Sequence, residues 1–357
     1  MLHLQKYLET HTPEDLKTEL DINFKAYDDR VIFKYGIKSP KYHPIVKECR
    51  GIVLSLVPGH TYEVMARGFD RFYNFGEGND CEVFDWNNCI IFNKMDGSLI
   101  KVYHDGNRWC TSTNGTAFAE GETPMGKSFH DLFVEAIGMD LQEMCKDWDT
   151  TNTSIFELTS PENRIVTKYY ETFVTLLAVR DNLRGFFVPY WALEVFVEEN
   201  ELPFKLCDSY PITTEEDLKD FVEGRDQLDE GCVLYDKGTQ MRIKMKNSSY
   251  VAIHHLRGNE VTVKSIISLL LKSEIDEYLV YFDTDLPMME PYINKYNELL
   301  KSVGDSYDVV KHIENQKEFA LIIKDVPYKG LLFSMRKGKT LDELFNLDNL
   351  NMIMKLF

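Results

Sequence analysis

The sequence predicts an α+β body built on antiparallel sheets in residues 1–257, followed by an all-helical domain in residues 258–357. Between about residue 31 and residue 250, short runs rich in β-branched and aromatic residues are separated by turns, as strands are. Beyond Gly258 the apolar residues repeat with helical spacing, and strand-like runs are nearly absent. A chain of 357 residues is long enough for two such domains.

The first domain should open with a helix that begins at Thr12, because Pro13 suits the first helical position and acids fill the first turn. A hairpin-type turn is expected at residues 104–107, His-Asp-Gly-Asn. Two helices should interrupt the strands, at roughly 125–146 and 213–224. The predicted strands are Val31–Tyr35, Gly51–Ser55, Cys89–Phe92, Leu99–Tyr103, Ser154–Leu158, Phe173–Val179, Cys232–Tyr235 and Met241–Met245.

The second domain should consist of helices. A capping box, Thr340 with Glu343, predicts where the last of them begins. The predicted helical stretches are Val261–Tyr281, Pro287–Val303, Ser306–Lys324 and Thr340–Phe357.

Composition and charge exclude several classes of protein. The longest apolar runs, such as Ser265–Leu271, are far shorter than the roughly 20 residues that span a bilayer, and the N-terminal residues lack the apolar region of a signal peptide. A net charge of −18 argues against a protein that coats nucleic acid non-specifically, although it permits a local basic cleft. Seven cysteines without a C-x-x-C spacing suggest reduced core thiols and no structural zinc site. We expect a cytoplasmic monomer without membrane contact.

Lys94 follows a predicted buried strand in the segment Asn93-Lys94-Met95-Asp96-Gly97-Ser98. A protonated lysine is a poor nucleophile, but it becomes a good one when burial or neighbouring cations lower its pKa. Taken alone, the segment fits equally well an exposed lysine that precedes a turn.

Charged residues also lie within predicted apolar strands. Glu157 and Glu230 are carboxylates at a strand interior and a strand start, and burying them is costly without a partner, whether a ligand or a core cation. Strand alternation places Arg242, Lys244 and Lys246 on one face. Three like charges there are destabilising unless an anion such as a triphosphate lies among them, or unless the face is solvated.

Two upstream segments combine cations with aromatic rings. Glu48-Cys49-Arg50-Gly51 precedes a strand, and residues 66–75 mix arginines with Phe and Tyr. Guanidinium groups bind phosphates and aromatic faces stack on bases, although both residue types also serve core packing.

The order of these segments resembles the nucleotidyltransferase superfamily of polynucleotide ligases and RNA capping enzymes, and within it the RNA ligase 1 family of T-even phages. The matching segments are ECRGIVLS, RGFDRFYNF, KMDGSL, FELTSPENRIV, TLLAVRD, EGCVLYDKG and RIKMKNSSYV. The resemblance implies an antiparallel-sheet nucleotidyltransferase (adenylation) domain in residues 1–257 and a helical domain for RNA or tRNA specificity in residues 258–357.

The resemblance also implies an activity, that of an ATP-dependent RNA ligase. Lys94 would take AMP from ATP, pass it to an RNA 5′-phosphate, and leave the 3′-hydroxyl to displace it. Mg²⁺ or Mn²⁺ would assist, with metal ligands left open. The substrate would be RNA ends, including a nicked tRNA anticodon loop, in the host cytoplasm if a phage encodes the chain.

Site residues follow from the matched motifs. The implied catalytic residues are Lys94, Glu157, Glu230, Lys244, Lys246 and Tyr250. The implied nucleotide-binding residues are Tyr35, Arg50, Arg71, Tyr73, Lys94, Glu157, Lys244 and Lys246. Lys244 and Lys246 are expected at the α-phosphate, where they should lower the pKa of Lys94. The strand with Leu176 and Leu177 should pack under the adenine. Asn114 departs from the family, which can carry a lysine there.

Two alternatives remain at this point. A DNA ligase or capping enzyme usually continues into a small β-barrel, for which residues 258–357 offer no strands. A non-enzymatic RNA-binding protein on a decayed ligase fold should have lost Lys94 or the Lys244 and Lys246 pair, and this chain keeps all three.

Overall fold

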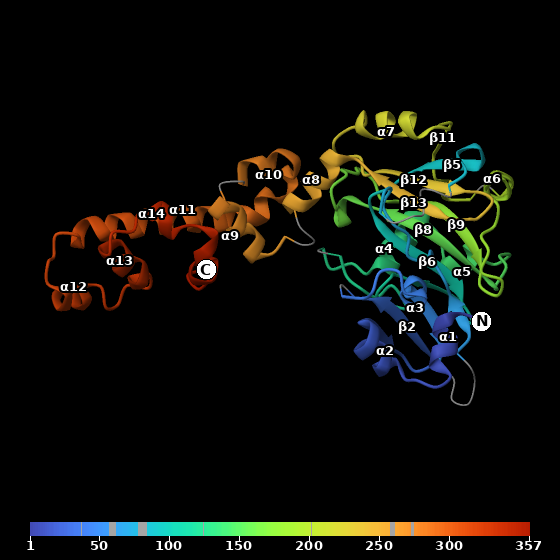
Figure 1. Cartoon of the computed structure of the whole chain (residues 1–357), viewed down its shortest axis with the longest axis horizontal. Coiled ribbons are helices and arrows are strands. Elements are labelled where there is room, and N and C mark those ends of the chain that lie inside the picture. The colour runs from blue at the N-terminus through green and yellow to red at the C-terminus, as the bar shows by residue number, and fades with distance from the viewer. Residues whose placement is uncertain are drawn as a thin grey trace. The chain divides into compact units, whose positions relative to one another are not determined.

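A computed structural model describes residues 1–36, 38–56, 62–77, 84–123, 125–200, 202–257, 261–272 and 275–357. It divides the chain into two compact units, Met1–Val251 and Ala252–Phe357. Gly258, at the predicted boundary, lies outside the described residues. The first unit holds the strands and the second holds helices (Figure 1), so the predicted α+β fold is confirmed.

The strands of the first unit form three sheets, with the orders β1-β2-β3-β4, β10-β9-β8-β6-β7 and β11-β5-β12-β13. Neighbouring strands are antiparallel except β9 and β10. The strands are β1 Ile22–Ala26, β2 Arg30–Tyr35, β3 Arg50–Ser55, β4 Val64–Ala66, β5 Cys89–Asn93, β6 Ser98–His104, β7 Trp109–Ser112, β8 Asn152–Thr159, β9 Phe173–Asp181, β10 Lys205–Leu206, β11 Ser209–Tyr210, β12 Gly231–Asp236 and β13 Arg242–Lys246. The helices are α1 His3–Leu8, α2 Pro13–Leu20, α3 Pro44–Glu48, α4 Phe129–Ile137, α5 Leu141–Met144, α6 Tyr190–Glu199 and α7 Glu215–Glu223.

The first sheet is covered by α1, α2 and α3, which share a core with β1, β2 and β3 (Figure 1). As predicted, α2 begins after Thr12, whose hydroxyl oxygen accepts from the backbone N–H of Asp15 at 3.3 Å. Glu48 in α3 fixes the start of α1, because its carboxylate accepts from the N–H groups of His3 and Leu4.

The central sheet carries α4 and α5 on one face, where Leu132 and Phe133 pack against Phe156 of β8. The predicted hairpin turn joins β6 and β7, and Asp105 accepts two backbone N–H groups within it. The prediction of one helix over residues 125–146 is wrong. Gly138 ends α4 in a left-handed conformation, and a new helix starts three residues later.

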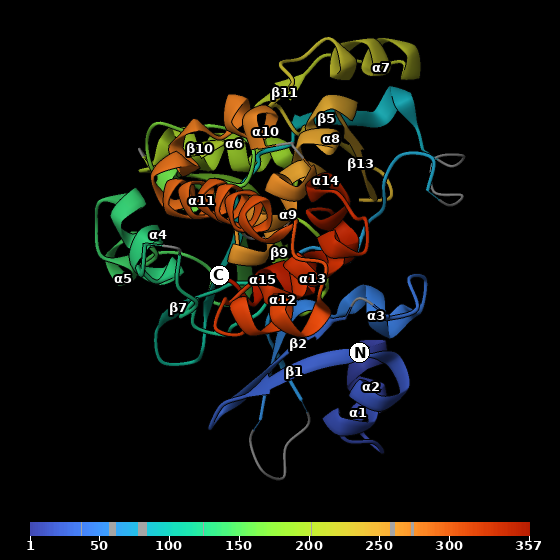
Figure 2. The ribbon, with the colours of Figure 1, turned by 90° about the vertical axis from the view of Figure 1, so that its left-hand side faces the viewer.

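The third sheet packs against α7, which lies beside β11 in both views (Figures 1 and 2). Leu218 and Val222 on the apolar side of α7 contact the core formed by β5, β12 and β13. The N-cap of α7 is Thr214, within the predicted helix 213–224.

The described part of the second unit contains helices and no strands. Its elements are α8 Ser248–Arg257, which begins in the first unit, α9 Val263–Lys272, α10 Ile275–Tyr281, α11 Leu286–Val310, α12 Gln316–Ile322, α13 Lys329–Arg336, α14 Leu341–Leu344 and α15 Leu350–Met354. Sequence reasoning divided α11 near Gly304. The helix continues because Val303 and Val310 on either side are both buried, which outweighs the roughly 1 kcal/mol helix cost of a glycine. No helix in the described parts of the chain is long and apolar enough to cross a membrane.

Candidate active site

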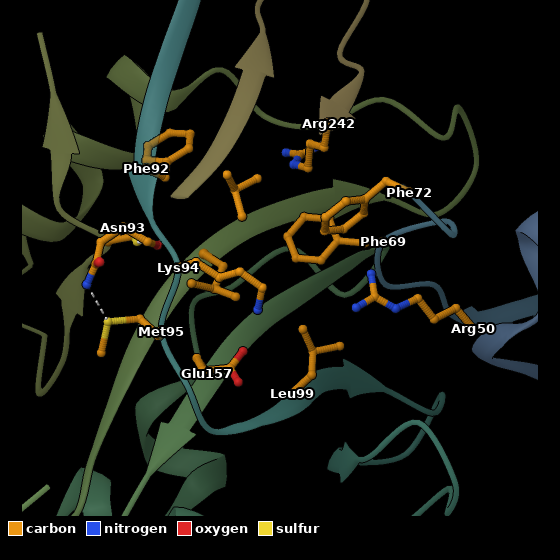
Figure 3. A pocket seen from close by; sticks show the side chains of 13 residues that line it. Arg50, Phe69, Phe72, Phe92, Asn93, Lys94, Met95, Leu99, Glu157 and Arg242 are labelled. Carbon is orange, nitrogen blue, oxygen red and sulfur yellow. Dashed lines mark hydrogen bonds between the residues drawn. The ribbon is translucent and has the colours of Figure 1, made fainter. Parts of the chain in front are cut away.

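A cavity lies between the central and third sheets, and Lys94 is on its wall (Figure 3). The third sheet contributes residues of β5, β12 and β13, and the central sheet contributes residues of β6, β8 and β9. Figure 3 shows Lys94 and Arg50 reaching toward the cavity from opposite sides. The lining residues are Arg50, Phe69, Phe72, Phe92, Asn93, Lys94, Met95, Leu99, Glu157, Leu177, Cys207, Val233 and Arg242.

Lys94 is held at the end of β5 by a backbone hydrogen bond and an ion pair. Its N–H donates to the carbonyl of Gly231 at 2.9 Å, and its Nζ lies 2.6 Å from Glu230 Oε2. Lys246 Nζ pairs with the other oxygen, Oε1, of Glu230 at 2.8 Å. Glu230 is only 7% exposed, so two cations satisfy one buried carboxylate.

This arrangement corrects one expectation. Burial favours a lower pKa for Lys94, but the carboxylates of Glu230 and Glu157 outweigh burial, and the pKa of Lys94 is raised. The lowered pKa that was expected for Lys94 is therefore not found in the protein by itself, where the carboxylates have the larger effect. The physical reason is distance, because the Glu230 carboxylate contacts the Lys94 ammonium directly.

Glu157 lies on β8, and its Oε1 accepts from the backbone N–H of Gly97 at 3.1 Å. Burial raises the pKa of Glu157 to about 8, and the charges of Glu230 and Asp96 add to this while Lys94 opposes it. The K-x-D-G turn fits against β8 only because residue 97 is glycine. A Cβ there would lie 2.4 Å from the carbonyl oxygen of Leu158.

Asp96 holds the same turn in place by accepting three hydrogen bonds. Its Oδ2 accepts the N–H groups of Val166 and Thr167, each at 2.8 Å, and its Oδ1 accepts the hydroxyl of Tyr250 at 2.7 Å. Tyr250 is fully buried and does not line the cavity. Its contacts include the turn that carries Lys94 and the side chain of Lys246, whose Nζ lies 5.4 Å from the Tyr250 ring centroid.

The predicted basic face of β13 is present. Ile243 and Met245 are buried, whereas Arg242, Lys244 and Lys246 share the opposite, half-buried face. Burial, together with the charges of Arg50, Lys94 and Lys246, lowers the pKa of Lys244 to about 8.

Arg242 is enclosed by aromatic rings. Its Cζ lies 3.9 Å from the ring centroid of Phe187, 4.4 Å from that of Tyr235 and 4.6 Å from that of Phe69. Burial lowers the pKa of its guanidinium to about 9.

The predicted nucleotide-binding residues fall into two groups. Arg50 lines the cavity with Lys94, and its guanidinium lies 4.9 Å from the Phe72 ring centroid. Arg71 and Tyr73 instead line an adjoining cavity, and Tyr35 stacks with Arg71 at 4.3 Å from Cζ to the ring centroid. These three residues do not line the cavity of Lys94, but the two cavities share Phe69, Phe72 and Arg242.

The region of Asn114 contains a lysine that sequence reasoning missed. Lys101 on β6 is fully buried, and its Nζ donates to the carbonyl of Thr113 at 2.6 Å. A Cβ on Gly51 would lie 3.0 Å from Lys101 Nζ and 2.9 Å from Asn114 Oδ1, so the two polar groups are neighbours. A lysine therefore does reach this region, from β6 and not from position 114.

Other lining residues also escaped prediction. Phe92 directly precedes Asn93 and Lys94, and Val233 lies beside Phe92 in the register of β5 and β12. Leu177 lines the cavity as expected, whereas Leu176 points into the core under α4. Sequence proximity to a motif could have found Phe92, but Cys207 and Phe69 depend on contacts between distant segments.

Known proteins resemble this chain over most of its length. A protein of Autographa californica nuclear polyhedrosis virus named as a bifunctional polynucleotide kinase/RNA ligase is 31% identical over 362 residues, covering 96% of this chain and 50% of that protein. The chain thus spans half the length of that relative. An RNA ligase of Rhodothermus phage RM378 is 24% identical, covering 91% of this chain and 89% of the phage protein.

The fold is also that of a solved structure. An archaeal ATP-dependent RNA ligase superposes with a TM-score of 0.50 at 15% identity, over 82% of this chain and 79% of that one. Residues 48–250, which contain Arg50, Lys94 and the basic face of β13, match the profile of the family described as RNA ligase. The chain belongs to the RNA ligase family, as its motifs predicted.

Proposed function

We propose that this protein is an ATP-dependent RNA ligase that joins a 5′-phosphate end to a 3′-hydroxyl end through an AMP bound to Lys94. The observation that carries the proposal is the position of Lys94, on the wall of a cavity that is lined by apolar side chains together with Arg50, Arg242 and Glu157. Family membership supports the same reaction class.

The side chains that line the cavity suit a nucleotide, which would have to extend beyond the cavity's volume of about 70 Å³. Phe92, Leu177 and Val233 offer apolar surface for a base, and ligand sites of this kind are mostly apolar with a few oriented polar groups. Arg50 lines the cavity, and Lys244 Nζ lies 5.8 Å from the ring centroid of Phe72, which also lines it. Both offer positive charge for phosphates, since guanidinium and ammonium groups bind phosphate oxygens strongly.

In the first step the Lys94 nitrogen attacks the α-phosphorus of ATP. The N–P bond forms, the bond from the α-phosphorus to its bridging oxygen breaks, and pyrophosphate leaves. The ammonium must first lose a proton, and Glu230 Oε2, 2.6 Å away, is the nearest acceptor. A nucleotide phosphate near Lys244 and Lys246 adds charge that these two lysines neutralise.

In the later steps AMP passes to an RNA 5′-phosphate, and the 3′-hydroxyl then displaces it. Each is an in-line displacement at phosphorus, which depends on positioning and on neutralised charge. Glu157 faces the cavity beside the K-x-D-G turn, so it is placed to orient the ribose or the RNA end.

A divalent cation would bind at this site through one protein carboxylate together with the substrate phosphates. No group of three metal-ligating side chains occurs in the described residues, which is compatible with Mg²⁺ because it commonly binds through one or two carboxylates plus substrate phosphates. Glu157 is the carboxylate that would hold the ion, since Glu230 is already paired with two lysines. The ion would supply charge neutralisation at the phosphates.

We infer an RNA substrate such as a nicked tRNA anticodon loop, acted on by a monomer in the host cytoplasm. The helical second unit replaces the β-barrel that DNA ligases and capping enzymes usually carry, in keeping with an RNA end. Comparing nicked stem-loops with linear RNA as substrates, and measuring the mass in solution, tests these finer points.

The first experiment incubates the protein with Mg²⁺ and α-labelled ATP and maps the labelled residue. An AMP adduct on Lys94 is expected. Lys94→Ala should lose the adduct and ATP-dependent joining, while it retains joining of pre-adenylated RNA ends better. Lys146→Met, at an exposed lysine, is the control. A labelled adduct of undiminished yield in Lys94→Ala would refute the role of Lys94.

A further inference from the structure

A second cavity of about 340 Å³ adjoins the first and shares Phe69, Phe72 and Arg242 with it. This volume lies within the range of small-molecule sites, roughly 300–1,000 Å³. Its remaining walls come from two distant segments, residues 185–187 and 239–241, and from residues that flank the first sheet, including Lys47 and Arg71.

The second cavity has an excess of positive charge. Its one carboxylate, Asp70, is already paired with Arg180 at 3.0 Å and with Arg67 at 2.8 Å. Lys47, Arg71 and Arg242 also line it, and none of them has an ion pair with a carboxylate among the described residues. Aromatic rings face all three cations, but no carboxylate in the described parts of the chain neutralises them, so the cavity keeps a net positive charge that favours an anion.

Arg71 provides a donor that the protein leaves unused. Its Nη1 is buried and has no hydrogen-bond partner within the described structure. Stacking on Tyr35 holds the guanidinium in place, at 4.3 Å from the ring centroid. A buried donor without a partner is costly, so a ligand that accepts from it gains more than a surface contact would give.

Aromatic rings complete the second cavity. Phe186 is 66% exposed, which is unusual for a phenylalanine, and the buried residues Phe187 and Tyr73 also line the cavity. Splayed RNA bases stack on such rings, and stacking tolerates any base. Cations with an exposed ring therefore match a nucleotide that carries a phosphate.

We propose that the second cavity binds the 5′-phosphorylated end of the RNA strand, with its terminal phosphate at Arg71 and Arg242 and a base on Phe186. This inference rests on the proposed function. A terminal phosphate here lies next to the cavity of Lys94, so one of its oxygens can attack the phosphorus of the lysyl-AMP. The new P–O–P anhydride forms, the N–P bond breaks, and the lysine nitrogen takes up a proton.

Two variants on the far wall test the proposal without touching the first cavity. Phe186→Ala removes an exposed ring and Lys47→Met removes one cation, while Trp191→Ala, at another exposed ring, is the matched control. Binding of a 5′-phosphorylated oligoribonucleotide and of its 5′-hydroxyl counterpart is measured by fluorescence anisotropy against salt. Adduct formation with α-labelled ATP is measured without RNA.

Phe186→Ala should weaken binding of the 5′-phosphorylated RNA about tenfold and leave adduct formation unchanged. Lys47→Met should lower the slope of log affinity against log salt by about 0.7. Trp191→Ala should match the wild type in both measurements.

Unchanged RNA binding in both variants would overturn the proposal. So would slower adduct formation with a raised KM for ATP, because the cavity would then hold the triphosphate tail. An absent adduct in the wild type would refute the ligase function, while the RNA-binding measurement would still decide the second cavity.

Discussion

Lys101 should make the stability of the protein depend on pH in a way that one substitution removes. Its side chain is fully buried, and its Nζ donates to Thr113 O at 2.6 Å. Burial, with a contribution from the charge of Arg50, lowers its pKa from 10.5 to about 7. The ammonium is therefore destabilised inside the folded protein.

The size of the effect follows from linkage. The unfolded chain keeps the lysine proton up to about pH 10.5, whereas the folded protein releases it near pH 7. Within this window the unfolded state binds more protons, so stability rises with pH by about 1.4 kcal/mol for each pH unit. Between pH 7 and pH 9 the contribution of Lys101 amounts to about 2–3 kcal/mol.

The assay is urea unfolding of the wild type and of Lys101→Met at pH 7 and pH 9. Other titrating groups contribute equally to both proteins and cancel in the difference. Lys101→Met also loses the hydrogen bond to Thr113, but Nζ can donate it as an ammonium or as a neutral amine, so the loss shifts the stability by a similar amount at both pH values. From pH 7 to pH 9, the free energy of unfolding of the wild type should rise by about 2–3 kcal/mol relative to that of the variant. Parallel pH dependences in the two proteins would refute a buried, destabilised ammonium, and Lys146→Met serves as the exposed control.

Three further changes test the site. Glu157→Gln should abolish sealing. Burial raises the pKa of Glu157 to about 8, so between pH 5 and pH 8 the folded wild type holds a proton that its unfolded chain releases, and its stability should fall as the pH rises. The variant should therefore gain stability relative to the wild type over this range, and a constant difference in urea unfolding would contradict this. Gly97→Ala would place a Cβ 2.4 Å from Leu158 O, so we expect the protein to be destabilised by about 1–3 kcal/mol and to form little AMP adduct. Wild-type values in urea unfolding and in the α-labelled ATP assay would count against the close approach. Tyr250→Phe removes the donor to Asp96 Oδ1 and should cost about 1.5–3 kcal/mol and slow adduct formation without raising the KM for ATP, whereas a raised KM would indicate direct nucleotide contact.

Local sequence pattern accounts for much of the fold. Each predicted strand lies at a strand of the structure, because alternation and β-branched composition act over neighbouring residues. The same alternation correctly placed Lys244 and Lys246 on one face of β13. Helix ends were less predictable, as Gly138 and Gly304 illustrate. One ends a helix and the other does not, and the difference lies in packing beyond the local sequence.

The sequence identified residues of the candidate site, but it did not predict how their charges act on one another. Lys94 and Glu230 were both identified, but the ion pair between them joins residues 136 positions apart. The sign of the Lys94 pKa shift depends on that distance, and a list of nearby cations in the sequence could not supply it.

By itself, the sequence determined the family and the strand positions, because these depend on motifs and on short-range periodicity, and it predicted Lys94 as the nucleophile. Only the tertiary structure revealed that Arg71 and Tyr73 line a cavity that adjoins the cavity of Lys94, and that Lys101 is buried beside Asn114. Cavities and pKa values are set by groups that folding brings within a few ångströms of one another from distant parts of the chain. Spacing along the chain does not encode those distances.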